Sequence, residues 1–309
     1  MIVRTTLALL FVIPAAMAYP WESTADRWLL GVAIAVVAVA FAWWRGMFVT
    51  MMVARRIAMV RSRNHTDGNH QAGEFATVVL RVESPEAVDF PLELVSGYLD
   101  RYGIRFDKVR VTSRDAEGAR TTWIGLTLGA ADNIAALRAR SSRIPLHDTV
   151  IVAARRMADH LREAGWEVSV DDTGTGAGVA PLAQGKETWR GVADDRGYIA
   201  AYRVDVGDNL AETLAAVWAS ESDEVWTALE LTGSRSTSEL AAACAIRTAE
   251  RPGSRAPLPG LEPERGRHRQ ALAALAPESD KRLSATPVRV SAERLAQLRW
   301  PVGAVLSRT

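Results

Sequence analysis

The stretch DDTGTGAGVAPLAQGKET, residues 171–188, contains the glycines and the Gly-Lys pair that a phosphate-binding loop could use. A Walker-type loop requires Gly, four residues and then Gly-Lys-Ser/Thr, because backbone N–H groups surround the phosphates while the hydroxyl binds magnesium. When this pattern is aligned on Gly185 and Lys186, Ala180 replaces the first glycine and Glu187 replaces the hydroxyl residue. The pattern fails at both positions. We therefore expect a flexible loop that joins two parts of the chain.

Two pairs of adjacent aspartates are the best candidates for catalysis. Asp171 and Asp172 follow an expected strand, and Asp194 and Asp195 lie at an expected turn. Paired carboxylates can hold the magnesium of a sugar nucleotide, but aspartate is also a favoured turn residue, and the sequence favours turns. A membrane-anchored enzyme that depends on a nucleotide or sugar nucleotide stays the alternative hypothesis. A small-ligand sensor that uses the loop at 174–185 is a third.

The remaining reactive residue types form no catalytic motif. Cys244 is the only cysteine and lies in the apolar run LAAACAI, which is typical of a buried thiol. His65 and His70 lie in a polar linker without a third metal ligand nearby. The net charge of +1 produces no field that would attract nucleic acid. We predict no catalytic, cofactor-binding or metal-binding residue. Six tryptophans are expected to fill cores or a partner interface: Trp123, Trp166, Trp189, Trp218, Trp226 and Trp300.

The N-terminal residues predict a membrane anchor. Residues 28–44, WLLGVAIAVVAVAFAWW, carry no charge, and at about 1.5 Å per residue they nearly cross a hydrocarbon core of about 30 Å. We expect a helical hairpin over residues 1–54, with spans at about 5–20 and 28–48. The first apolar run also resembles a signal peptide with an Ala-x-Ala site, although the short loop after it favours an uncleaved span. The expected anchors at the membrane interface are Trp28, Trp43, Trp44, Arg45, Arg55 and Arg56.

Basic residues determine the expected orientation of this anchor. Arginines cluster after the second span, and cytoplasmic loops carry an excess of Lys and Arg. Residues 55–73 should therefore form a basic stalk and linker that contacts anionic lipid head groups from the cytoplasmic side. We expect a multi-pass protein of the inner (plasma) membrane with most of the chain in the cytoplasm.

The rest of the chain predicts an α+β domain of antiparallel or mixed sheets covered by helices. The expected parts are a first lobe at 74–172, a glycine-rich loop at 173–187 and a second lobe at 188–309. Each lobe contains an expected strand, a helix, and a pair of strands followed by a helix. The expected strands lie at 75–83, 104–113, 121–128, 166–171, 188–193, 197–206, 224–233 and 238–248, and the helices at 90–102, 130–140, 147–164, 208–220 and 263–276, before a strand and a helix within 287–299.

Several segments together carry a family resemblance. They are the two apolar runs, the exit FAWWRG, the basic stalk and, in order, GEFATVVLRV, DRYGIRFDKVRVTSRD and TTWIGLTLGAADNIAALRARSSRIPLHDTVIVAARRMADHLREAGWEV. With these segments the chain resembles EccE, a membrane component of actinobacterial type VII (ESX) secretion systems, over essentially its whole length. Chain length and the spacing of the later segments favour the paralogue of the iron-acquisition-linked system.

The resemblance implies a structural role. EccE-like proteins join EccB, EccC and EccD in an inner-membrane complex that exports small helical protein pairs, with EccC as the ATPase. The resemblance implies a non-catalytic subunit without a cofactor, whose partners are EccD, EccB and EccC-like subunits and membrane lipids. The family pattern contains no catalytic residues, so none is carried over.

Overall fold

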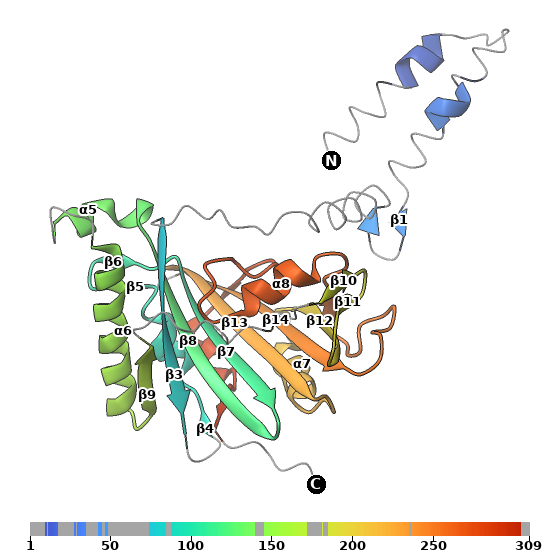
Figure 1. Cartoon of the computed structure of the whole chain (residues 1–309). Helices are drawn as coiled ribbons and strands as arrows, with labels where there is room; N and C mark the ends of the chain where they lie inside the picture. Colours follow the sequence, from blue (N-terminus) through green and yellow to red (C-terminus); the bar gives the residue numbers. More distant parts are fainter. Residues whose placement is uncertain are drawn as a thin grey trace. The chain divides into compact units, whose positions relative to one another are not determined.

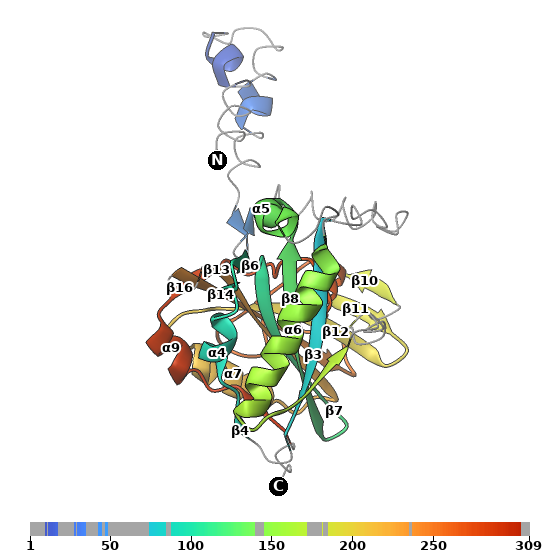
Figure 2. The same cartoon turned by 90° about the vertical axis from the view of Figure 1, so that its left-hand side faces the viewer.

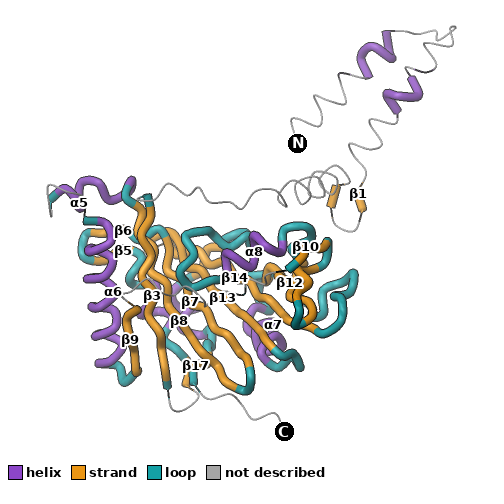
Figure 3. The backbone as a smooth tube through the Cα atoms, viewed as in Figure 1, coloured by secondary structure: helices purple, strands orange, loops and turns teal. Residues whose placement is uncertain are grey.

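The structure is a computed structural model. It describes residues 74–84, 88–139, 145–171, 181, 185–234 and 237–303, and in the first 73 residues it describes 10, 12–17, 28, 30–34, 43–44 and 47–48. The chain divides into two compact units, Met1–Asp67 and Gly68–Thr309. Figure 1 follows the chain through both units, and Figure 3 separates the helices, strands and loops.

The first unit contains short helical stretches at 12–17 and 30–34. Strand β1 (Trp43–Trp44) pairs antiparallel with β2 (Met47–Phe48). These residues were expected to continue the second helical span to about residue 48, and that expectation is wrong here, because aromatic residues also favour paired strands. Among the described residues, none of the helices combines the length and the hydropathy that a membrane crossing requires. Arg45, Arg55 and Arg56 lie outside the described residues.

The second unit is built on one 11-stranded sheet. Every strand pairing among the described residues is antiparallel. The α+β class is confirmed, and of the two sheet types expected, antiparallel or mixed, the described residues form the antiparallel one. The strand order is β10 (Lys186–Thr188), β11 (Gly191–Asp194), β12 (Gly197–Val204), β14 (Thr237–Thr248), β13 (Glu224–Ser234), β7 (Lys108–Ala116), β8 (Ala119–Gly129), β3 (Phe75–Glu83) and β9 (Glu167–Asp171), while β15 (Leu261–Pro263) pairs with β12 and β16 (Val288–Val290) with β14.

The two halves of the sequence share this sheet. Hairpin β7–β8 closes at Ala116 and Ala119, and hairpin β13–β14 closes 118 residues later at Ser234 and Thr237. Val111 of β7 pairs with Leu229 of β13, and these two residues also lie 118 positions apart. The two hairpins are therefore related by a pseudo-twofold axis that passes between Val111 and Leu229. Two lobes with separate sheets were expected, and this part of the prediction is wrong because the long β7–β13 pairing joins the halves.

Helices cover the sheet on opposite faces (Figures 1 and 2). Alternate residues of a strand point to opposite faces, so Val78, Leu80 and Val82 of β3 pack in the core under α6, whereas Val79 belongs to the core on the α8 face. The helices are α4 (Leu92–Ser96), α5 (Ile134–Arg138), α6 (Leu146–Glu163), α7 (Leu210–Trp218), α8 (His268–Leu275) and α9 (Ala292–Gln297), with a 3-10 turn η1 (Ala131–Asn133).

Most predicted elements agree with the structure. The strand expected at 188–193 is instead divided between β10 and β11, and the strand expected at 104–113 is divided between a short strand at Ile104–Arg105 and β7. The helix expected at 90–102 ends at Ser96, and β5 (Asp100–Arg101) and β6 (Ile104–Arg105) form a small hairpin there. Its turn residues Tyr102 and Gly103 have φ values of 58° and 69°, and positive φ at both central positions is typical of a type I′ turn. One further two-stranded sheet pairs β4 (Val88–Asp89) with β17 (Pro301–Val302), which brings the C-terminal segment beside the beginning of the domain.

Candidate functional site

A cluster of three buried charges lies on adjacent strands at the centre of the sheet. Arg110 of β7 pairs in register with Glu230 of β13, and Arg110 Nη2 donates to Glu230 Oε2 at 2.5 Å. Lys108 Nζ lies 3.8 Å from the same oxygen. All three side chains are at most 2% exposed. Charges removed from water to this degree must be paired and hydrogen-bonded. We call Lys108, Arg110 and Glu230 the Lys108 cluster.

The Lys108 cluster holds the segment that follows α8, residues 276–283, against the sheet. Arg110 Nη1 donates to the carbonyl oxygens of Ala276 at 3.0 Å and Ser279 at 3.3 Å, and Lys108 Nζ donates to that of Lys281 at 2.5 Å. The Leu283 N–H donates to Glu230 Oε1 at 3.3 Å. Burial, with Arg110 nearby, lowers the pKa of Lys108 to about 7. The charged groups of the cluster therefore make structural contacts within the domain.

Glycine makes this close approach possible. A Cβ atom on Gly125 of β8 would lie 2.3 Å from the carbonyl oxygen of Pro277, which is far inside van der Waals contact. The 276–283 segment thus rests directly on the backbone of the sheet at this position.

A second buried network, the Glu224 cluster, joins four strands. Glu224 Oε2 accepts from Arg247 Nε at 2.8 Å, and Glu224 Oε1 accepts from Arg114 Nε at 2.8 Å. Arg247 Nη1 also donates to both carboxylate oxygens of Asp194 at 2.9 Å. Burial alone raises the pKa of Glu224, but hydrogen bonds from Arg247, Trp226 and Arg114 hold it below its usual value.

The two pairs of aspartates that were candidate metal ligands do not form a joint site among the described residues. The side chain of Asp194 is 5% exposed and belongs to the Glu224 cluster, whereas Asp195 is exposed at the turn between β11 and β12. Asp171 is the last residue of β9, and Asp172 lies outside the described residues. No group of three His, Cys, Asp or Glu side chains suited to a metal ion is found in the described part of the chain. The geometry of Asp194 gives the enzyme hypothesis no support.

The end of the glycine-rich stretch is a strand. Lys186 begins β10 and pairs with Ala193 of β11. A Cβ atom on Gly185 would lie 2.0 Å from the Ala193 carbonyl oxygen, so this glycine allows close strand contact. Glu187 Oε1 accepts a hydrogen bond from the Arg269 N–H in the first turn of α8 at 3.0 Å. The three glycines Gly174, Gly176 and Gly178 lie outside the described residues.

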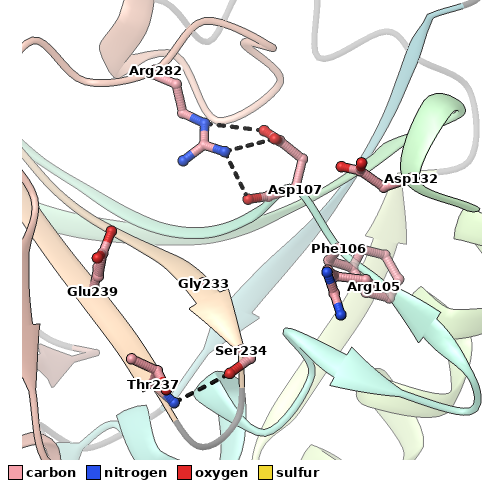
Figure 4. Close-up of a pocket in the computed structure, with 9 residues that line it drawn as sticks. All are labelled: Arg105, Phe106, Asp107, Asp132, Gly233, Ser234, Thr237, Glu239 and Arg282. Carbon is pink, nitrogen blue, oxygen red and sulfur yellow. Dashed lines mark hydrogen bonds and ion pairs between the residues drawn. The ribbon is translucent and has the colours of Figure 1, made fainter.

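A depression of about 480 Å³ lies at the strand ends near Asp107 (Figure 4). Arg282 and Asp107 form an ion pair in its wall, with Nη2 2.6 Å from Oδ1 and Nε 3.1 Å from Oδ2. Ser234 Oγ accepts from the Thr237 N–H at 3.2 Å, and the described lining contains no histidine or cysteine that could activate this hydroxyl. The lining residues are Arg105, Phe106, Asp107, Asp132, Gly233, Ser234, Thr237, Glu239 and Arg282.

His268 on α8 is fully buried, and we expect it to make the stability of the domain depend on pH. Its Nδ1 accepts a hydrogen bond from the Ala201 N–H of β12 at 3.1 Å, and burial lowers its pKa to about 4. Between pH 6.5 and 4 the unfolded chain binds a proton at this site and the folded chain does not, so the free energy of unfolding should fall as pH drops. The expected loss is about 3 kcal/mol, at about 1.4 kcal/mol per pKa unit.

This loss is measurable by urea denaturation at pH 7, 5.5 and 4. His268→Asn keeps an acceptor for the Ala201 N–H but cannot bind the proton. The variant should show a shallower pH dependence than the wild type. Equal slopes would contradict the assignment to His268.

Asp194 and Asp195 should respond differently to the same substitution. Asp194→Asn removes the anion that receives two contacts from buried Arg247, and we expect a loss of about 2 to 4 kcal/mol in the free energy of unfolding. Asp195→Asn at the exposed position should change it by less than about 0.5 kcal/mol. Thermal denaturation of both variants measures the difference, and equal small effects would show that the Asp194 contact contributes little.

Sequence comparison identifies the family. A family model described as "type VII ESX secretion system translocon, EccE" matches residues 116–204, from the end of β7 to the end of β12. The ESX-3 secretion system protein EccE3 of Mycolicibacterium smegmatis is 54% identical over 288 residues, which cover 93% of this chain and 92% of the relative. The chain belongs to the EccE family. EccE3 of Mycobacterium tuberculosis H37Rv is 47% identical over 310 residues, covering 96% of this chain and 91% of that relative.

These matches confirm the resemblance drawn from the sequence. The EccE relatives carry the ESX-3 name, in agreement with the expected paralogue, and they are named as secretion-system proteins and not as enzymes. This EccE chain is therefore a component of a type VII secretion system. Cys244 is 0% exposed and burial raises its pKa, as expected for a structural thiol.

Sequence reasoning missed both buried clusters of this EccE chain. The available signal was the presence of charged residues at inward positions of apolar strands, as in KVRV at 108–111 and ALEL at 228–231. Which charges pair depends on the β7–β13 register, and the sequence did not indicate that pairing.

Of the expected interface anchors, Trp28 is 73% exposed and Trp43 and Trp44 form β1.

Proposed function

We propose that this chain is a non-catalytic structural subunit of an inner-membrane type VII secretion complex and docks its folded domain on neighbouring subunits. The observation that carries the proposal is 54% identity to an ESX-3 secretion system protein over 93% of the chain. The Lys108 and Glu224 clusters support it, because their charged side chains bind one another and the backbone inside the domain instead of facing a substrate. The proposed partners are EccD, EccB and EccC-like subunits.

The proposed anchor is the N-terminal hairpin, with the folded domain in the cytoplasm. Its support is the uncharged run at 28–44 and the arginines that follow it. A variant with Cys244→Ser and single cysteines at Ser23 or Ser62 tests the orientation. A membrane-impermeant thiol reagent added to intact cells should label only the cysteine at 23, and labelling at 62 would reverse the topology.

Complementation of a deletion strain tests the docking role. The full chain should restore both the size of the complex on a native gel and the export of substrate into the medium. A chain that ends at residue 73 should insert but restore neither, since it lacks the folded domain. Asp195→Asn, at an exposed site that the enzyme hypothesis requires, should restore both. An Asp195→Asn chain that assembles normally but exports nothing would favour the enzyme alternative.

A further inference from the structure

The β5–β6 hairpin presents a tyrosine in a strained backbone conformation. Tyr102 has a φ of 58° and its side chain is 42% exposed. A bulky residue at positive φ is uncommon, and asparagine or glycine is usual at this position of a type I′ turn. Strained residues of this kind persist only where the surrounding structure holds them in place, and they cluster at binding and catalytic sites. The turn residue is therefore a candidate for a role beyond folding.

Two arginines from different elements stack on this tyrosine. The guanidinium carbon of Arg156, on α6, lies 4.6 Å from the centre of the Tyr102 ring, and that of Arg101, on β5, lies 5.4 Å from it. Arg101 also lies 4.6 Å from the centre of the Tyr98 ring. These distances are within the range of cation–π contacts. Each contact favours an orientation in which the guanidinium group lies over a ring.

Neither guanidinium contacts a carboxylate among the residues that the structure describes. Some arginines elsewhere on the domain differ: Arg120 contacts Asp115 at 2.5 Å, and Arg282 and Arg299 each contact an aspartate at 2.6 Å. The stacked pair thus keeps its hydrogen-bond donors available at the surface. Val152, one helical turn before Arg156 on α6, adds an apolar side chain that is 49% exposed.

We propose that Arg101, Tyr102 and Arg156 form a docking surface for an acidic segment of another subunit in the secretion complex. Adjacent Asp or Glu side chains of the partner would receive hydrogen bonds from the two guanidinium groups, while its apolar atoms would pack on the Tyr102 ring. Tyrosine and arginine are the residue types that most often dominate interface energies. The inference rests on the proposed function, since it requires assembly with other subunits. The surface lies on the α6 side of the domain, which faces the viewer in Figure 2.

A photo-crosslinking experiment on the assembled complex tests the occupant. Tyr102 is replaced by p-benzoylphenylalanine in the full chain, the complex is irradiated in native membranes, and the crosslinked peptide is sequenced by mass spectrometry. A crosslink to a partner segment in which Asp and Glu outnumber Lys and Arg is expected. A crosslink to lipid or to a basic segment, or no crosslink in an assembled complex, would overturn the inference.

Three variants separate docking from folding. Arg101→Glu with Arg156→Glu reverses both charges, and the amount of complex retained per tagged chain after mild-detergent purification should fall roughly tenfold. Tyr102→Asn removes the ring but favours the Asn-Gly turn, so the hairpin should stay folded while retention falls roughly fivefold. The control Arg251→Glu reverses one charge, where the double variant reverses two, at an exposed position in the loop between β14 and β15. It should retain the complex as the wild type does.

The outcomes distinguish the two proposals. Equal retention by all variants would disprove the docking surface and leave the proposed function intact. A wild-type chain that retains no secretion subunit would disprove the proposed function as well. Equal losses in Arg251→Glu and in the double variant would show a general charge effect and overturn the assignment to Arg101 and Arg156.

Discussion

Glu230→Gln should lower the free energy of unfolding by about 3 to 5 kcal/mol. The substitution leaves Arg110 and Lys108, which are both 1% exposed, without their only close anion in the cluster. It also weakens the acceptor of the Leu283 N–H, so the 276–283 segment should loosen. Lys108 can lose its proton near its pKa of about 7. The loss should therefore be larger at pH 6 than at pH 9.

Urea denaturation of the Gly68–Thr309 unit, followed by tryptophan fluorescence, measures this effect. The matched control is Glu239→Gln, because Glu239 lies on β14 in a half-exposed ion pair with Arg289 at 3.9 Å. Its expected change is less than about 0.5 kcal/mol. If Glu230→Gln also changed stability by less than about 1 kcal/mol, the buried cluster would not hold the segment as described.

Trp300→Ala should lower the free energy of unfolding by about 3 to 5 kcal/mol. Trp300 is 0% exposed, its ring packs edge-on against Trp218 at 5.4 Å, and its Nε1–H donates to Ser113 Oγ at 3.0 Å. Its carbonyl oxygen accepts from the Phe90 N–H at 2.8 Å. The alanine side chain would leave a cavity, and Ser113 Oγ would keep only its hydrogen bond with Thr122 Oγ1 at 2.8 Å. The C-terminal segment would lose a buried contact with the core.

Denaturation combined with hydrogen exchange measures this attachment. The Phe90 amide should exchange faster in Trp300→Ala. Trp300→Phe keeps most of the ring volume and should cost only about half as much, because it loses the Ser113 hydrogen bond but leaves a smaller cavity. Equal stability of the alanine and phenylalanine variants would show that Trp300 is not packed as described.

Local patterns predicted most elements of the domain. The period-2 run TTWIGLTL predicted a strand at 121–128, and β8 spans Ala119–Gly129. The run VIVAARRMADHLREAG predicted the helix that became α6, since its apolar residues recur at helical spacing. The expectation that several tryptophans fill cores is confirmed for Trp123, Trp226 and Trp300, which are at most 8% exposed.

Long-range features could not be predicted in the same way. The pairing of β7 with β13 joins residues more than 100 positions apart, and periodicity within a strand does not identify its neighbour. The Glu224 cluster depends on that pairing and on the β13–β14 hairpin. Because neither pairing is visible in the sequence around Asp194, its contact with Arg247 could not be predicted, and the sequence indicated a turn residue or a metal ligand. Tyr102 was placed in a helix, because its αL backbone is unusual for tyrosine and no local signal predicts it.

The most direct test of a docking subunit is purification of the tagged full chain from its native membrane in a mild detergent. We predict that EccB-, EccC- and EccD-like subunits co-purify with it in fixed proportions and run together on a native gel. The Arg251→Glu chain should retain the same set. A wild-type chain that is extracted intact but carries none of these subunits would contradict the account.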